Sequence, residues 1–469
     1  MKYFSTRNKS EKYNFKEVFL RGLASDGGLF VPENIKKFDK ADFLKLKKLN
    51  YIQLALEIVS YFCGNDIDKK KLKNIIEKSY YNFLIENVVS IKSFDNLNVL
   101  ELYHGPTLAF KDIAMQVIGN LYSEFIKETK DPINIIVATS GDTGAAAVNA
   151  LKQKKNINLF VLHPHNKISK MQRKIMTSEN FYFSNKISKN IFNIAVKGTF
   201  DDCQNIVKKM FNDEKFRKTI NLSGVNSINW ARIIFQIIYY FYAYFKISHS
   251  EKVNFSVPTG NFGDVYAGYL AKKMGLPIDK LIVSTNENDI LQRVINTGEY
   301  IPKEVKPSIS PSMDIQVASN FERLIFDATN FNDTEVDLLM SDLKKKGSFK
   351  LKKEYLEYIQ QSFIGVKVND KETRETIEKI YKKHNFIIDP HTAIAIKAQE
   401  KINIDTKTVC LATAHPYKFV ETVEKIIGIK MEIPIQGSFL GPDEKYEVLE
   451  NDIEVIKKYI KKRAHHNED

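Results

Sequence analysis

The stretch PINIIVATSGDTGAAA, residues 132–147, joins an expected strand to an expected helix through a loop of small and polar residues. Its first half, PINIIVA, is a nearly continuous apolar run, which is typical of a strand buried on both faces of a parallel sheet. The small residues of the loop let a ligand approach the backbone, and the first turn of the next helix offers unpaired N–H groups to an anion. This junction predicts an α/β protein that binds its ligand at the carboxyl end of the strand.

Further apolar runs of strand length lie on either side of residues 228–246 and are separated by helical stretches. The apolar stretch 233–245 is interrupted by Gln236 and is too short to cross a bilayer comfortably, so we expect a buried helix there. Two groups of buried strands predict an α/β fold of two open, mainly parallel-sheet lobes, with a ligand cleft between them. The expected strands are 132–138, 157–162, 191–196, 253–258, 281–284 and 408–413.

The length of 469 residues exceeds what one ordinary core organises and predicts two or three domains. We expect a mostly helical N-terminal domain over 1–95, an α/β lobe over 96–250, a second α/β lobe over 251–435 and a helical C-terminal tail over 436–469. The patterning of segment 300–365 is too weak to assign, and the polar end of the tail is expected to be frayed.

The net charge of +13 does not indicate a nucleic-acid partner, because only nine of the 70 basic residues are arginine. Arginine is the preferred residue for bidentate contacts to phosphates and bases, whereas the lysines here lie in short runs mixed with acids, as on solvated helix faces. No membrane partner is expected either. The sequence favours a small-molecule substrate and a protein that works as a monomer or a homodimer.

The cysteines and histidines form no metal or disulfide pattern. Cys63, Cys203 and Cys410 lie far apart without a CxxC pair, which favours a reducing compartment. The N-terminal residues lack the apolar core of a signal peptide, so a cytoplasmic location is expected. The nine histidines do not form a ligand set, and no metal site is predicted.

Two further strand-to-helix junctions carry loops rich in glycine, threonine or asparagine. In VPTGNFGDVYAG, residues 257–268, the segment 260–263 can surround a phosphate with backbone amides, although it is neither GxGxxG nor a Walker loop. In CLATAHPYKF, residues 410–419, Thr413 follows the end of a strand. Each loop alone is as well explained by a tight turn. Three such loops on one sheet pattern indicate a binding site.

Lys111 lies in the segment HGPTLAFKDIAMQVIGNLYSEFI, residues 104–126, where it is the only lysine or arginine. On a helical wheel it shares an apolar face with Ala114, Met115 and Ile118. Burial disfavours the ammonium form and lowers the pKa of a lysine, and a neutral amine is what Schiff-base chemistry with an aldehyde requires.

On statistics alone, a lysine whose stem packs on apolar residues and whose ammonium reaches water is the commoner case. Thr107, in the turn before Lys111, is a candidate helix cap. Lys111 together with a phosphate-binding glycine loop far downstream suggests pyridoxal phosphate, which supplies an aldehyde to the lysine and a phosphate to the loop.

These segments, taken together, closely resemble the threonine synthases. The resemblance is carried, in this order and spacing, by DGGLFVP (26–32), HGPTLAFKD, TSGDTGAA, NSINWAR (226–232), GNFGD and TAHPYKF, and it extends from the N-terminus to about residue 430. Thr259 and Tyr417 depart from the residues usual at their positions, and neither removes a functional group that the reaction needs. The resemblance implies a pyridoxal-phosphate enzyme of fold type II, in the tryptophan-synthase-β fold group, that converts O-phospho-L-homoserine and water to L-threonine and phosphate.

The resemblance also assigns the cofactor residues. Lys111 would hold the cofactor through a carbon–nitrogen double bond and then act as general base and acid. Thr413 would hydrogen-bond the pyridine nitrogen, and a neutral hydroxyl there makes the ring a weaker electron sink than a carboxylate would. The loop that would bind the cofactor phosphate consists of Gly260, Asn261, Phe262, Gly263 and Asp264.

The substrate phosphate needs a site of its own. Arg232 is one of few arginines and precedes the apolar helix, which fits a buried fork for a dianion; a helix-end residue paired with an acid is the alternative. Lys167 is a weaker candidate, because lysines in surface loops are common. The other expected substrate-binding residues are Thr139, Ser140, Asp142, Thr143, Ser227 and Asn229.

Two alternatives to this function remain open at this point. A threonine-synthase-like phospholyase would carry the same cofactor motifs and eliminate phosphate from another small phosphorylated amine. A catalytically inactive descendant that serves as a basic binding protein is the other, and the joint presence of Lys111, the glycine loop and Thr413 argues against it.

Overall fold

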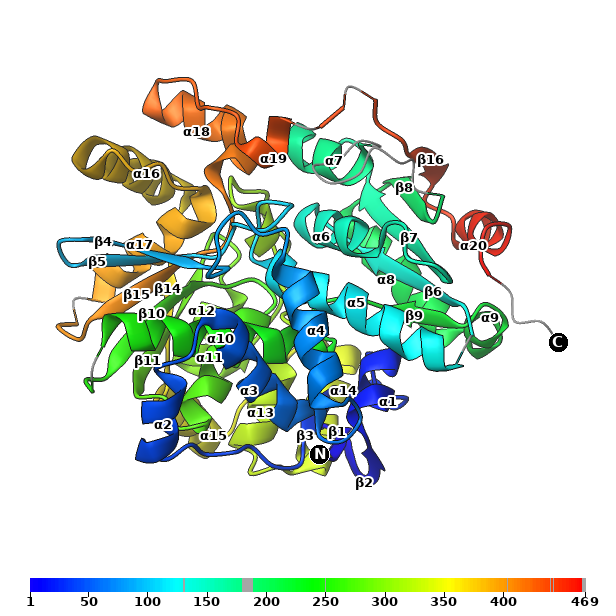
Figure 1. The fold of residues 1–469 in the computed structure, drawn as a ribbon, viewed down its shortest axis with the longest axis horizontal. Coiled ribbons are helices and arrows are strands. Elements are labelled where there is room, and N and C mark those ends of the chain that lie inside the picture. The colour runs from blue at the N-terminus through cyan, green and yellow to red at the C-terminus, as the bar shows by residue number, and fades with distance from the viewer. Residues whose placement is uncertain are drawn as a thin grey trace.

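The structure is a computed structural model, and it describes residues 1–129, 131–178, 189–248, 250–402, 404–438, 440–441 and 443–465. Two α/β lobes lie side by side in it, with helices on both faces of each sheet (Figure 1). The expected fold class, two open and mainly parallel-sheet lobes, is confirmed.

The larger lobe is built on a six-stranded sheet in the order β14-β11-β10-β15-β5-β4, parallel except for the edge strand β4. In the middle of the sheet, Ser256 lies opposite Ile282 on one side and Cys410 on the other. The strands are β4 (Ser90–Phe94), β5 (Leu97–Glu101), β10 (Val253–Pro258), β11 (Ile278–Thr285), β14 (Phe363–Lys367) and β15 (Thr408–Ala412). The helices around them are α11 (Gly263–Lys273), α12 (Ile290–Thr297), α16 (Asp370–His384), α17 (Pro390–Ile402), the short η2 (Pro416–Phe419) and α18 (Val420–Ile427).

The smaller lobe has a fully parallel five-stranded sheet in the order β16-β8-β7-β6-β9. Its central strand β7 is buried along its whole length, as the apolar run predicts. The strands are β6 (Ile133–Ala138), β7 (Ile157–Pro164), β8 (Ile191–Lys197), β9 (Leu222–Gly224) and β16 (Glu447–Glu450). The helices are α5 (Lys111–Thr129), α6 (Asp142–Leu151), α7 (Lys170–Thr177), α8 (Phe200–Asn212), α9 (Glu214–Thr219) and α20 (Ile453–Lys461).

All six strands expected from the sequence are present, and the expected buried helix is α10 (Trp230–Ile247). Its side chains from Trp230 to Tyr244 are all buried, because the helix packs against α11, α5 and α3 (Tyr51–Cys63) at once. Among the described residues, no helix combines the length and the apolar character needed to span a membrane.

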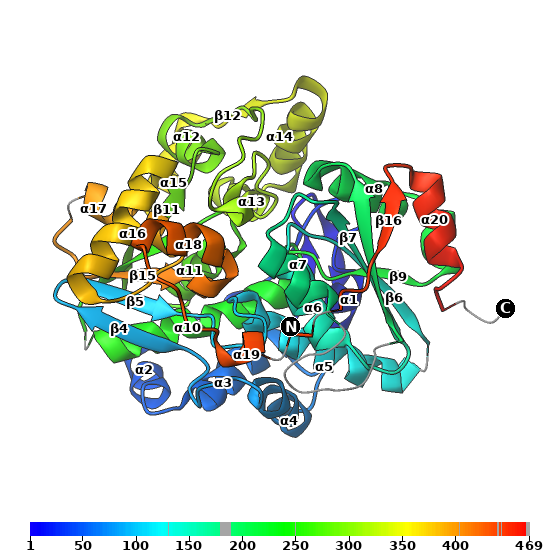
Figure 2. The ribbon, with the colours of Figure 1, turned by 90° about the horizontal axis from the view of Figure 1, so that it is seen from above.

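The N-terminal region is more than a helical domain, because three of its segments form a small antiparallel sheet in the order β2-β1-β3. Viewed from above, α2, α3 and α4 lie along one side of the two lobes (Figure 2). The elements are β1 (Tyr3–Ser5), β2 (Asn8–Tyr13), α1 (Phe15–Arg21), β3 (Phe30–Pro32), α2 (Lys40–Leu46), α3 (Tyr51–Cys63) and α4 (Lys69–Tyr80).

Segment 300–365, which the sequence leaves unassigned, begins with a long loop over the larger lobe and continues with helices. Phe321 and Phe349 stack on the ring of Tyr300, which ties the ends of this segment together. The elements are β12 (Glu299–Tyr300), the short helix η1 (Pro311–Met313), α13 (Phe321–Ala328), α14 (Asp333–Lys346), β13 (Phe349–Lys350) and α15 (Lys353–Gln360).

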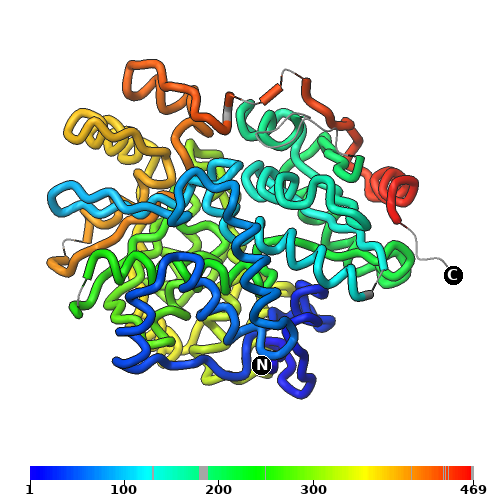
Figure 3. Tube along the Cα trace, viewed as in Figure 1, coloured from blue at the N-terminus to red at the C-terminus, as the bar shows by residue number. Residues whose placement is uncertain are grey.

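The sheets divide the chain differently from the expected boundaries. Strands β4 and β5 flank residue 96, where we expected the first lobe to begin, yet both belong to the sheet of the larger lobe because β5 pairs with β15. The C-terminal tail is not purely helical: after α19 (Ile435–Ser438) the chain crosses to the smaller lobe, where β16 extends its sheet beside β8 (Figure 3). Residues 466–469, expected to be frayed, lie outside the described residues.

Candidate active site

A cavity of about 160 Å³ lies where the carboxyl ends of strands from both sheets meet. The loops after β6, β10 and β15 and the start of α5 all line it. It therefore brings together the three glycine- or threonine-containing loops, the Lys111 segment and NSINWAR, which the sequence predicted to carry chemistry. The predicted residues that line it are Lys111, Thr139, Ser140, Asp142, Thr143, Ser227, Arg232, Gly260, Asn261, Phe262, Gly263, Asp264 and Thr413.

Lys111 is the first residue of α5, and its side chain is 13 % exposed. The neighbours expected on its helix face, Ala114, Met115 and Ile118, are fully buried. Burial lowers the pKa of Lys111, Asp142 opposes this shift, and the positive charge of Arg232 adds to it. Lys111 is therefore not a lysine whose ammonium reaches bulk water, and its amine faces the cavity.

The expected helix cap at Thr107 is wrong, because α5 begins only at Lys111. Instead, the backbone N–H and the hydroxyl of Thr107 both donate to the carboxylate of Asp112, at 2.7 Å each. Burial raises the pKa of Asp112 to about 6, although these hydrogen bonds oppose the shift. The turn is thus folded back on the residue that follows Lys111, which fixes the direction of the lysine.

Asp142, the first residue of α6, is the centre of the polar contacts around Lys111. Its Oδ2 lies 3.3 Å from Lys111 Nζ and accepts from the hydroxyl of Ser312 at 2.9 Å. Its Oδ1 accepts from Lys418 Nζ at 2.6 Å and from the amide of Gln172 at 3.0 Å. Burial alone would raise the pKa of Asp142, but Lys418 and Lys111 hold it well below its ordinary value.

The loop after β6 is shaped by Thr139, whose hydroxyl accepts from the N–H groups of Gly141 and Gly144 at 2.9 Å each. Gly141 has φ +129°, a conformation that side chains rarely adopt, and α6 starts directly after it without a side-chain cap. Ser140 and Thr143 line the cavity beside this helix start. Hydroxyls and helix N–H groups suit a carboxylate or a phosphate.

The glycine loop after β10 ends at the start of α11, which also has no side-chain cap. Phe262 adopts a left-handed conformation, φ +63°, and its buried ring packs against Phe321 and Phe363, which holds the strained residue in place. A Cβ on Gly260 would lie 2.7 Å from the carbonyl oxygen of Ser312, so only glycine fits there. The backbone N–H groups at this helix start are available to an anion.

Asp264 combines burial with an unused oxygen. Its Oδ1 accepts from the hydroxyls of Tyr239 and Tyr240, at 2.5 and 2.8 Å, whereas Oδ2 is buried and has no hydrogen-bond partner among the described residues. Burial raises the pKa of Asp264 to about 6, and the two tyrosines oppose the shift. Its carboxyl group is therefore protonated below about pH 6 and is a buried carboxylate in the cavity wall above it.

We expect Asp264→Asn to change how stability depends on pH in the cofactor-free protein. The raised pKa of Asp264, from 3.8 to about 6, means that the folded state holds its proton longer than the unfolded state. Wild-type stability therefore falls, by up to about 3 kcal/mol from this group, as the pH rises from about 4 to about 6 and above. The variant lacks this loss. In urea unfolding, its free energy of unfolding relative to that of the wild type should therefore be higher at pH 8 than at pH 4.5. A difference that is independent of pH would contradict the assignment.

Arg232 lies in the first turn of α10 and is 2 % exposed. Its Nε and Nη1 are buried without a hydrogen-bond partner in the described part of the chain, and both belong to a side chain that lines the cavity. Burial lowers the pKa of Arg232 to about 10. The alternative of a helix-end residue paired with an acid is not what the structure shows. An unpaired buried guanidinium beside a cavity fits an anionic ligand.

Two predicted substrate residues lie elsewhere. Asn229 caps α10: its side chain accepts from the N–H of Ala231 and donates to the carbonyl of Phe19, at 3.0 Å each. Lys167 is exposed in the turn after β7 and does not line the cavity. Asn229 was predicted from its place in NSINWAR, and there its side chain serves the start of α10 instead of lining the cavity.

The structure also shows contributors that the sequence did not reveal. Lys418, Gln172 and Ser312 bind the carboxylate of Asp142. His391 also lines the cavity: its Nδ1 lies 2.6 Å from Asp389 Oδ2, and its Nε2 has no partner among the described residues. Only Lys418 carried a signal, because it lies within TAHPYKF. The others lie in segments without a recognisable motif.

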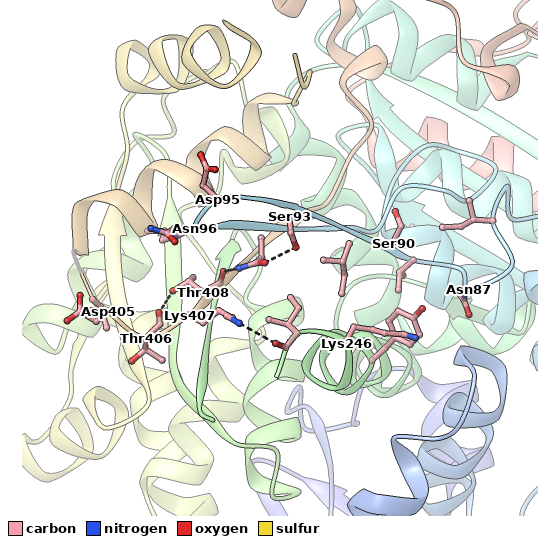
Figure 4. Close-up of a pocket in the computed structure, with 18 of the residues that line it drawn as sticks. Asn87, Ser90, Ser93, Asp95, Asn96, Lys246, Asp405, Thr406, Lys407 and Thr408 are labelled. Atoms are coloured by element: carbon pink, nitrogen blue, oxygen red, sulfur yellow. Dashed lines mark hydrogen bonds between the residues drawn. The ribbon is translucent and has the colours of Figure 1, made fainter. Parts of the chain in front are cut away.

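A second and larger cavity, about 1090 Å³, lies between the β4–β5 hairpin, the end of α10 and residues 404–408 (Figure 4). Its polar groups bind one another: Ser93 donates to the Asn98 side chain at 2.9 Å, and Lys407 donates to the carbonyl of Ile247 at 3.4 Å. None of the predicted site residues lines it. The residues with catalytic chemistry therefore lie in the smaller cavity.

Within the part of the chain that the structure describes, no group of three or more His, Cys, Asp or Glu side chains is placed to hold a metal ion. The ring of His163 is buried and its pKa falls to about 4 because of that burial. It packs near Tyr446 instead. The cavity is thus lined by an amine, a guanidinium, carboxyls and helix starts, which are groups for anions and carbonyls.

Comparison with known families accounts for nearly the whole chain. The profile described as "Pyridoxal-phosphate dependent enzyme" matches residues 96–414. The profiles described as "Threonine synthase N terminus" and "Threonine synthase, C-terminal" match residues 2–80 and 392–460. Along the chain, the three matches cover the N-terminal region, the two lobes and the C-terminal segment in turn.

Individual relatives agree with the profiles. The chain is 41 % identical to the threonine synthase of Pseudomonas aeruginosa over 466 residues, which cover 98 % of each chain, and 41 % identical to that of Saccharomyces cerevisiae, with 91 % of this chain and 89 % of the relative covered. The crystal structure of PLP-bound threonine synthase from Brucella melitensis superposes with a TM-score of 0.92 at 40 % identity, covering 99 % of both chains. By these matches, the chain belongs to the threonine synthase family of pyridoxal-phosphate-dependent enzymes.

Proposed function

We propose that this protein is a threonine synthase, which converts O-phospho-L-homoserine and water to L-threonine and phosphate. The single observation that carries the proposal is the cavity that joins a buried amine, Lys111, to an uncapped helix start at Gly263 and to an unpaired guanidinium, Arg232. The reaction needs an amine for the cofactor aldehyde and two separate anion sites. Membership of the threonine synthase family supports the same activity.

The residues of the cavity fit pyridoxal phosphate. The Lys111 amine is buried and its pKa is lowered by that burial, as covalent attachment to an aldehyde requires. The backbone of the loop from Gly260 to Asp264, with the uncapped start of α11, suits the cofactor phosphate, and Thr413 lines the cavity and would hydrogen-bond the pyridine nitrogen. When bound, the cofactor supplies an electron sink that makes the protons on the neighbouring carbons of the substrate removable.

The protein's own groups supply binding and proton transfer. Arg232, with Ser227 beside the glycine loop, would hold the substrate phosphate, and Ser140, Thr143 and the start of α6 would hold its carboxylate. Lys111 would carry protons between carbon atoms of the substrate, because a lowered pKa makes its neutral amine more available as a base. Asp142 Oδ2 lies 3.3 Å from that amine and would orient it towards the substrate.

We also propose that the protein works in the cytoplasm as a monomer or a homodimer. Cys63, Cys203 and Cys410 are all free and buried, which supports a reducing compartment. Size-exclusion chromatography with light scattering would decide between one and two copies.

The proposed activity is tested with purified protein, pyridoxal phosphate and O-phospho-L-homoserine. We expect threonine and inorganic phosphate in equal amounts. Release of phosphate with 2-oxobutyrate and ammonia instead of threonine would favour the alternative, a phospholyase with the same cofactor residues. L-Homoserine, which lacks the phosphate, serves as the control substrate and should give no product, because it has neither the leaving group nor the anion that Arg232 would bind.

A further inference from the structure

Two buried lysines share the carboxylate of Asp142, and they share it unequally. Lys418 Nζ donates to Oδ1 at 2.6 Å, whereas Lys111 Nζ lies 3.3 Å from Oδ2. Lys418 also donates to the carbonyl of Thr107 at 3.0 Å, and its side chain is fully buried. Lys418 is thereby fixed between the turn that precedes α5 and the first residue of α6. The close ion pair of Asp142 is with Lys418 and not with Lys111.

The charge balance of this cluster decides which form of Lys111 tolerates burial. One carboxylate balances one ammonium, and Lys418 already occupies Asp142. A neutral Lys111 therefore leaves the cluster balanced, whereas a protonated Lys111 adds an uncompensated positive charge in a buried site. Without the Lys418 ammonium, Asp142 would be balanced only by a protonated Lys111.

The other charged groups that face Lys111 act less directly. Arg232 comes from α10, and its positive charge also disfavours the ammonium. Asp264 comes from α11, and burial raises the pKa of its carboxyl group to about 6. The remaining contacts of Asp142 are the uncharged side chains of Gln172 and Ser312. Lys418 is thus the cation that reaches Lys111 through a shared carboxylate.

We propose that Lys418 is a positioning residue that keeps the Lys111 amine neutral, by occupying the carboxylate of Asp142 that would otherwise hold Lys111 as an ammonium. The neutral amine is the form that attacks an aldehyde, so Lys418 prepares the chain for its cofactor without touching the reacting atoms. The inference rests on the role proposed above for Lys111 and adds a second lysine to it.

The test reads the protonation of Lys111 in the full chain freed of cofactor. The rate at which acetic anhydride modifies Lys111 is followed across pH by mass spectrometry of its peptide, since only the neutral amine reacts. In Lys418→Met, which keeps the unbranched shape of the side chain one atom shorter and without its charge, we expect the midpoint of this titration to move to higher pH by about one unit or more. The pH dependence of cofactor attachment, followed by its absorption, should move in the same direction.

Three further variants separate a charge effect from a loss of structure. Lys418→Arg keeps the positive charge and should restore most of the wild-type midpoint. Lys273→Met removes the lysine of another partly buried pair, with Asp327, outside the cavity, and should leave the midpoint in place. In Asp142→Asn no carboxylate lies between Lys111 and the Lys418 ammonium. The midpoint of the Lys111 titration should therefore move to lower pH, opposite to its movement in Lys418→Met.

An unchanged midpoint in Lys418→Met with a normal thermal melt overturns the proposal, and so does a Lys418→Arg midpoint that moves as far as that of Lys418→Met. Should Lys418→Met not fold, Asp142→Asn decides, since a midpoint that does not fall is incompatible with the shared carboxylate. Modification of Lys111 does not depend on which substrate the enzyme uses. A protein that makes no threonine but shows these shifts would therefore refute the proposed function and keep this inference.

Discussion

Lys111→Ala should lower the turnover of O-phospho-L-homoserine by about 10⁴-fold or more, because it removes the amine that we propose to bind the cofactor and to transfer protons. It should also abolish the visible absorption of lysine-bound cofactor. The fold should survive, since Asp142 keeps its 2.6 Å ion pair with Lys418 when Lys111 is gone. Steady-state kinetics, an absorption spectrum and a thermal melt measure the three effects.

The matched control for this variant is Lys154→Ala. Burial also lowers the pKa of Lys154, to about 8, but its Nζ donates to the side chain of Asn120 at 2.6 Å and it does not line the cavity. This variant should keep activity and absorption, and borohydride reduction of the wild type should mark the Lys111 peptide and not the Lys154 peptide. Activity retained in Lys111→Ala would disprove the cofactor assignment.

Arg232→Met should lower kcat/KM for the phosphorylated substrate by about 10²-fold or more, the usual cost of removing one partner of a buried charged contact. Cofactor affinity should change only a few-fold, because the site that we propose for the cofactor phosphate is the start of α11. Because Nε and Nη1 of Arg232 are buried and unpartnered in the described residues, replacing the guanidinium should also stabilise the substrate-free protein. Kinetics, a cofactor titration and urea unfolding provide the three measurements.

Arg323→Met is the control, because Arg323 is equally buried and burial likewise lowers its pKa to about 10. Its guanidinium is satisfied, with donors to the carbonyls of Phe30 at 3.0 Å and Ile228 at 2.7 Å and to the side chain of Asn320. Removing it should therefore destabilise the protein, the opposite sign to Arg232→Met. Equal losses of cofactor and substrate binding in Arg232→Met would make Arg232 a structural residue.

Much of the fold could be predicted from the sequence because its strands are buried on both faces. A strand such as β7 has no exposed side chain, so it reads as a continuous apolar run and needs no information from elsewhere in the chain. Sheet membership could not be predicted in the same way. Strand β5 pairs with β15 and β16 pairs with β8, and nothing within these short segments distinguishes one sheet from the other.

In the candidate site, too, the residues that could be predicted are those that depend on a local sequence pattern. Lys111 and the glycine loop are recognisable because their chemistry requires particular residue types next to one another along the chain. Asn229 does not line the cavity although Ser227 and Arg232 of the same motif do, because neighbours in a motif need not point to the same side. Asn229 serves the backbone of α10, as asparagine at a helix start commonly does.

The sequence by itself determined the alternation of strands and helices, the amine, the glycine loop and the family, because these depend on local patterning and on the order of motifs. Only the tertiary structure decided which groups of the site are protonated and which are paired. Whether Lys111 is neutral, Arg232 unpaired or Asp264 protonated depends on burial and on which distant charges come within a few ångströms, such as Lys418 beside Asp142. Those distances are set by how the two lobes and the C-terminal segment pack, and the chain order does not contain them.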